Sequence, residues 1–140
     1  MLPQQKFREI VLQLLYSHDI GKADPEDMIS MIMGELEVSK KSVVAAQERV
    51  NQILEKIPEI DDTIAKASLS YSFERIQTVE RNIIRLGIFE LKYDDKIPPK
   101  VAIAEAIRLA RKFGSPESAT FVNAVLDKIF QESNKQNQQE

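Results

Sequence analysis

The sequence predicts an all-α protein of about seven helices in two packed three-helix-bundle-like halves. Three observations lead to this fold class. Apolar residues recur at helical spacing, no segment alternates apolar and polar residues between turn signals, and glycines and prolines fall mainly between the helical patterns. The expected single domain covers residues 1–132, with an N-terminal half at 1–58, a C-terminal half at 59–132 and a polar flexible tail at 133–140.

The N-terminal half shows three helical patterns. The first has one apolar face and ends at Gly21; that face consists of Phe7, Ile10, Val11, Leu14 and Leu15. The motif Asp24-Pro25-Glu26 is typical of a helix start and precedes an apolar stripe of Met28, Ile32 and Leu36. Ser39 opens the third helix, and Pro58 is expected to end it.

The C-terminal half begins with a short helix that we expect to start at Ile60-Asp61-Asp62 and to end near Leu69, before a connector at residues 70–73. Thr78 starts the most apolar helix, which is hydrophobic nearly all round and should therefore be central. Gly87 lies inside it. Glycine is unfavourable in a helix by about 1 kcal/mol relative to alanine, so we expect a neighbouring helix to approach closely there.

Two further helices complete this half. Ile97-Pro98-Pro99 launches the first of them, with Gly114 after its end; its expected buried side is Val101, Ile103, Ala106, Ile107, Ala110 and Phe113. Ser115-Pro116-Glu117 caps the last helix, whose stripe is Phe121, Val122, Val125, Leu126, Ile129 and Phe130.

Composition excludes several classes of protein. The chain has no cysteine and one histidine, His18, which excludes disulfide scaffolds, Cys-ligated metals and any metal site needing two histidines. The net charge is −3, and residues 1–60 carry all of it. This argues against unassisted, unspecific nucleic-acid binding. The start has no signal-peptide pattern and no run is long enough to span a membrane, so we expect a cytoplasmic protein without membrane contact.

No pattern of residues predicts catalysis. Nothing marks a serine as activated by His18, and the pairs Asp61-Asp62 and Asp94-Asp95 are better explained by capping and solvation. No glycine-rich phosphate loop is present. We therefore expect no enzyme, no cofactor and no metal. Basic residues on helix faces are most simply explained by solvation and local pairs such as Glu105–Arg108, and spacing alone favours burial of Tyr16 and Phe121.

Four motifs in the C-terminal half, in their order and spacing, resemble the transcription antitermination protein NusB family. They are Asn82-Ile-Ile-Arg-Leu-Gly-Ile-Phe-Glu-Leu91, Ile97-Pro-Pro-Lys-Val-Ala-Ile-Ala-Glu-Ala-Ile107, Ala110-Arg-Lys-Phe-Gly114 and Phe121-Val-Asn-Ala-Val-Leu-Asp127. The segment Arg8-Glu-Ile-Val-Leu-Gln-Leu-Leu-Tyr-Ser17 looks like the family's first helix. The resemblance covers about residues 1–130, and only the helical pattern agrees over 22–58.

The resemblance implies a function and partners. Members bind the boxA element of ribosomal RNA transcripts, taken here as single-stranded RNA, together with the ribosomal protein NusE, within an antitermination complex on RNA polymerase. No reaction is catalysed and no cofactor is used. A homodimer is a further possibility that the resemblance implies, since some members self-associate through the same surface that binds their partners. The alternative is a helical protein–protein adaptor, binding NusE or itself, with weak or lost RNA binding.

The family's functional positions map onto eight residues of this chain. The RNA-binding set is Lys6, Arg8, Glu117, Phe121 and Asn123, and the partner-binding set is Tyr16, Glu80 and Arg85. The family's N-terminal basic segment corresponds to Gln4-Gln5-Lys6-Phe7-Arg8. It carries few positive charges here, because Gln4 and Gln5 stand where some members have arginines. Fewer phosphate contacts reduce the electrostatic share of RNA affinity. This deficit predicts RNA recognition that depends on the second protein.

Overall fold

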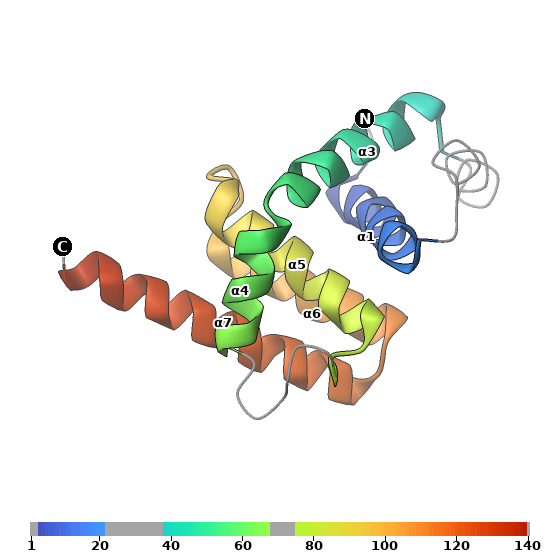
Figure 1. Ribbon diagram of the computed structural model, residues 1–140. Coiled ribbons are helices and arrows are strands. Elements are labelled where there is room, and N and C mark those ends of the chain that lie inside the picture. Colours follow the sequence, from blue (N-terminus) through green and yellow to red (C-terminus); the bar gives the residue numbers. More distant parts are fainter. Residues whose placement is uncertain (1–2, 22–37, 68–74, 140) are drawn as a thin grey trace. The chain divides into compact units, whose positions relative to one another are not determined.

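A computed structural model describes residues 3–21, 38–67 and 75–139 of the chain (Figure 1). Within these residues every regular element is an α-helix, and six helices are present. They form two compact units, residues 1–55 and residues 56–140. The helix predicted after Asp24 and the connector at 70–73 lie outside the described residues. The all-α prediction is confirmed.

The described residues of the first unit form two helices in contact, α1 (Gln4–Ile20) and α3 (Lys40–Glu55). Gly21 ends α1 as predicted. Its φ of 71° is left-handed, and its N–H donates to the carbonyls of Ser17 and His18. Ser39 opens α3, because its Oγ accepts the N–H of Ser42 at 3.2 Å. The predicted apolar stripe of α1 faces inward, with the exception of Phe7, which is half-buried.

The second unit begins with α4 (Ile57–Ala67), which starts earlier than predicted. The sequence indicated that Pro58 stops one helix and that Ile60 starts the next. Instead α3 ends at Glu55, and Pro58 lies in the first turn of α4. A proline is tolerated there because the N–H groups of a first turn have no intrahelical partner. Asp61 and Asp62 therefore lie within the helix and do not cap it.

Helix α5 (Thr78–Tyr93) is central to this unit, as predicted. It contacts α4, α6 (Pro99–Phe113) and α7 (Pro116–Gln139), and every residue from Asn82 to Glu90 is buried. Gly87 permits the close approach that the sequence predicted. A Cβ atom at this position would lie 2.9 Å from Leu126 Cδ1 of α7 and 3.6 Å from Ala106 Cβ of α6.

The buried side of α6 differs from the prediction. Val101 and Phe113, expected in the core, are 41% and 36% exposed. The buried apolar residues are Ala106 and Ala110, as predicted, together with Ala102 and Leu109. Three of these four are alanines, and α6 packs on α5 where Gly87 stands. Close packing of the two helix backbones selects small side chains there and turns the larger ones outward.

Helix α7 begins as predicted and extends further than predicted. The Ser118 N–H donates to Ser115 Oγ at 3.1 Å, which caps the first turn. The backbone stays helical to Gln139, whereas the sequence predicted a tail without helix from Ser133. No glycine or proline interrupts this stretch, so nothing in it ends the helix. No helix among the described residues is both long and apolar enough to cross a membrane.

Candidate functional site

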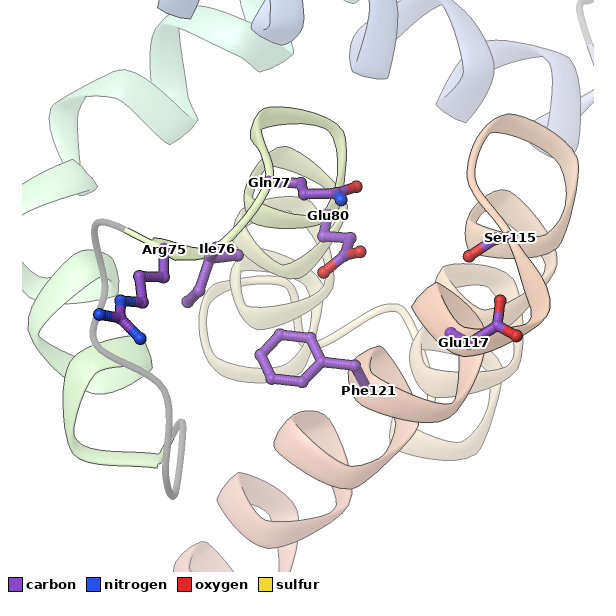
Figure 2. Close-up of a pocket in the computed structure, with 7 residues that line it drawn as sticks. All are labelled: Arg75, Ile76, Gln77, Glu80, Ser115, Glu117 and Phe121. Carbon is purple, nitrogen blue, oxygen red and sulfur yellow. The ribbon is translucent and has the colours of Figure 1, made fainter.

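A hollow of about 250 Å³ lies in the second unit where α5 and α7 begin, and we call it the α5–α7 hollow. It is lined by Arg75, Ile76, Gln77, Glu80, Ser115, Glu117 and Phe121. The first four come from the start of α5 and the residues just before it, and the last three from the start of α7 and its capping residue. Figure 2 shows the side chains of Glu80 and Phe121 in the middle, with Arg75 and Ile76 to the left and Ser115 and Glu117 to the right.

Hydrogen bonds hold one wall of the hollow in place. Ser118 Oγ, on a side chain that is almost fully buried, donates to Glu80 Oε1 at 2.8 Å. The Ser115 and Ser118 hydroxyl oxygens lie 3.1 Å apart. The cap of α7 is thus linked to a carboxylate on the first turn of α5. Glu80 is therefore oriented before any ligand arrives.

The lining combines an apolar floor with polar groups of both kinds. The Phe121 ring and Ile76 supply apolar surface. Glu80 and Glu117 offer carboxylate acceptors, while Arg75 and Gln77 offer donors. An aromatic face surrounded by donors and acceptors suits a planar ring that stacks and forms hydrogen bonds through its edge. Among the described residues no group of three or more His, Asp or Glu side chains is placed to hold a metal ion.

The structure brings together three of the predicted residues and separates a fourth from them. Glu80, Glu117 and Phe121 all line the α5–α7 hollow. Glu117 and Phe121 share a face because they are four residues apart on α7. Asn123 is exposed but lies two residues beyond Phe121, which places it on a different face of the helix.

Sequence reasoning missed four lining residues, Arg75, Ile76, Gln77 and Ser115. Arg75, Ile76 and Gln77 directly precede α5, where the sequence shows no helical pattern. Ser115 was assigned only a capping role. The available signal was position, because residues next to the start of a helix that carries one site residue are candidates for the same site.

Arg85, which the sequence predicted to bind a partner, is largely buried in the second unit. It is 8% exposed. Its Nε and Nη2 atoms donate to Asp61 Oδ1 and Oδ2 at 2.9 and 2.8 Å, and its Nη1 donates to Asn82 Oδ1 at 3.2 Å. The guanidinium of Arg85 therefore binds the carboxylate of Asp61 in a bidentate manner and links α5 to α4. This geometry gives Arg85 a structural role, with Asp61 as its ion-pair partner rather than a solvated cap, and a contact of Arg85 with NusE stays a prediction.

The predicted residues of the first unit fall into two groups. Lys6 is exposed, but Arg8 is only 6% exposed, so α1 presents less basic surface than the sequence predicted. Tyr16 is 39% exposed and Ile20, one turn later, is 37% exposed. Spacing alone favoured burial of Tyr16. Its side chain is exposed because Tyr16 lies next to the apolar stripe of α1 and is not part of it.

The fold and the hollow define an all-helical binding protein, and comparisons identify its family. A profile of the NusB family matches residues 5–131. The chain is 40% identical over 131 residues to the transcription antitermination protein NusB of Chlamydia pneumoniae, covering 94% of this chain and 82% of that one. Its structure is similar to that of T. maritima NusB, with a TM-score of 0.79, 32% identity and coverage of 94% and 92%.

A second structural relative was solved with partners. It is described as antitermination factors NusB and NusE in complex with dsRNA, and it matches with a TM-score of 0.77 and 27% identity, covering 92% of this chain and 96% of that chain. The family profile and the Chlamydia relative together settle the family. This chain belongs to the NusB family.

Proposed function

We propose that this chain is a cytoplasmic transcription antitermination factor that binds boxA RNA of ribosomal RNA transcripts together with NusE and acts on RNA polymerase without catalysis. The observation that carries the proposal is the α5–α7 hollow, where Glu117 and Phe121 meet in a chain of the NusB family. The related NusB solved with NusE and dsRNA supports both proposed partners.

The RNA contacts in this proposal divide between the two units. Phe121 stacks on a base and Glu117 accepts a hydrogen bond from a base amino group, while Lys6 contacts a phosphate. Asn123 is exposed and takes a contact outside the hollow. Arg8 was assigned to the same set, but its burial leaves Lys6 as the main cation that α1 offers to RNA.

NusE binding is assigned to Tyr16 and Glu80. Tyr16 offers an exposed aromatic ring with Ile20 beside it, and aromatic residues are enriched at protein interfaces. Glu80 offers a carboxylate that Ser118 already orients. A chain of net charge −3 gains little from general phosphate attraction, so a second protein is needed to complete the RNA surface.

A titration tests this function. The full chain, with and without NusE, is added to labelled boxA RNA, to a scrambled RNA of the same composition and to boxA RNA annealed to its complement. We expect weak binding by the chain alone, tighter binding with NusE, and preference for the single-stranded boxA sequence. Equal affinity for boxA and scrambled RNA, or no effect of NusE, would contradict the proposal.

A matched pair of variants tests the hollow. Phe121→Leu removes the stacking ring from the hollow, whereas Phe113→Leu removes a 36% exposed ring that does not line it. Loss of one stacked base costs about 1–3 kcal/mol, so Phe121→Leu should weaken boxA binding by about tenfold or more. Phe113→Leu should leave it unchanged. Equal effects of the two variants would remove the hollow from the RNA site.

The second candidate function is a protein–protein adaptor with weak or lost RNA binding. The exposed Tyr16–Ile20 pair and the burial of Arg8 favour it. Lys6→Ala discriminates between the two functions: for an RNA-binding factor it lowers RNA affinity and salt dependence while NusE binding survives. If RNA affinity is absent or unchanged and Tyr16→Ala abolishes NusE binding or self-association, the adaptor is the better description.

A further inference from the structure

A second and larger hollow lies in the first unit, where α1 and α3 begin, and we call it the α1–α3 hollow. Its volume is about 690 Å³. The side chains that matter are Gln4 and Phe7 of α1 and Ser42, Lys41 and Arg49 of α3. None of the residues named above as RNA- or partner-binding lines it.

The lining is basic. Among the described residues that line it, Lys41 and Arg49 are the charged ones, and none of these described residues is a carboxylate. Lys40, which directly precedes Lys41, is exposed as well. This concentration of positive charge stands within the half of the chain that carries the whole net negative charge. Its natural ligand is therefore polyanionic.

The spacing of the two cations fits a chain of phosphates better than a single anion. Lys41 and Arg49 are eight residues apart on one helix, which separates them by roughly 12 Å along its axis. Phe7 lines the same hollow and is half-buried, so part of its ring is open to a ligand. A basic groove with an aromatic side chain is the combination that binds single-stranded nucleic acid.

We propose that the α1–α3 hollow binds a stretch of single-stranded RNA that flanks boxA, with Lys41 and Arg49 on its phosphates and Phe7 stacked on a base. This inference rests on the proposed function and extends it. At the start of α3 both Lys40 and Lys41 are exposed, whereas at the start of α1 Lys6 is exposed and Arg8 is buried.

The test compares two variants of equal charge in the full chain with NusE. Lys41→Gln/Arg49→Gln removes two charges from the hollow. Lys66→Gln/Lys135→Gln removes two from exposed positions of the other unit. Fluorescence anisotropy measures binding of the boxA core alone and of boxA extended by oligouridine at either end, at several salt concentrations.

We expect the hollow variant to bind one extended RNA roughly tenfold more weakly, with a salt slope lower by about 1.4 for two single-strand phosphate contacts. Affinity for the boxA core should not change, and the control variant should behave as wild type. Photocrosslinking of extended RNA carrying 4-thiouridine should label Phe7 or its neighbours.

Three results would overturn the inference, and they are distinguishable. If wild type binds the boxA core but the hollow variant loses nothing on either extended RNA, the hollow is no RNA site while the proposed function stands. If wild type binds none of the RNAs, both fail. If the hollow variant loses NusE and keeps its RNA affinity, the hollow is a protein-docking surface.

Discussion

Replacing Arg85 separates its structural role from the partner-binding role that the sequence indicated. Arg85→Met removes two hydrogen bonds to Asp61 and one to Asn82. Removing one partner of a buried ion pair destabilises a protein by about 3–5 kcal/mol. Asp61 keeps 24% of its side chain exposed and so regains some hydration. We therefore expect the lower end of that range, about 3 kcal/mol.

Urea unfolding followed by circular dichroism measures this loss. With an m value of about 2 kcal/mol/M, the midpoint should fall by about 1.5 M. Arg85→Met/Asp61→Leu leaves no unpaired charge and should recover most of the loss. A midpoint shift below about 0.3 M for Arg85→Met would refute the reasoning. If a variant of Arg85 is still fully folded but no longer binds NusE, Arg85 takes part in NusE binding.

Three further predictions concern the glycines and the cap. Leu126→Ala should lower the free energy of unfolding by about 2–5 kcal/mol in wild type. In the Gly87→Ala background the same substitution should lower it by at least about 1 kcal/mol less, because the added methyl group occupies space that the Leu126 side chain fills in wild type. Additive effects of the two substitutions in urea unfolding would contradict this. Ser115→Ala should cost about 1 kcal/mol through the lost cap, seen as a lower melting temperature, and no change would deny the cap. Gly21→Ala should cost about 1 kcal/mol in thermal unfolding because its φ is 71°, and a stability equal to wild type would show that α1 can end otherwise.

The sequence predicted the helices well where a stripe or a cap specified them. Gly21, Ser39, Thr78 and Ser115 lie at helix ends as expected, because each end depends on local chemistry that a short motif contains. Pro58 misled the prediction, since a proline fits equally well after one helix or inside the first turn of the next. Only the neighbouring helices decide between these two positions.

The core and the site were less predictable, because they depend on contacts between distant segments. The predicted buried side of α6 included Val101 and Phe113 beside Ala106 and Ala110, but where α5 approaches at Gly87 most of the buried residues are alanines. Likewise Arg85 resembles a surface cation until α4 supplies Asp61, 24 residues earlier. Glu80, Glu117 and Phe121 were predicted through the family resemblance. That they line one hollow depends on how α5 packs against α7, which the sequence does not show.

The unbroken burial of α5 from Asn82 to Glu90 has a consequence for synthesis on the ribosome. This helix leaves the ribosome before α6 and α7, and at about 5–20 residues per second those two helices follow over several seconds. During that interval α5 can pack against α4, which is made before it, but not yet against α6 and α7. A product that ends before α7 would leave exposed the part of α5 that contacts α7, such as the surface at Gly87. The last helix therefore completes the cover of α5.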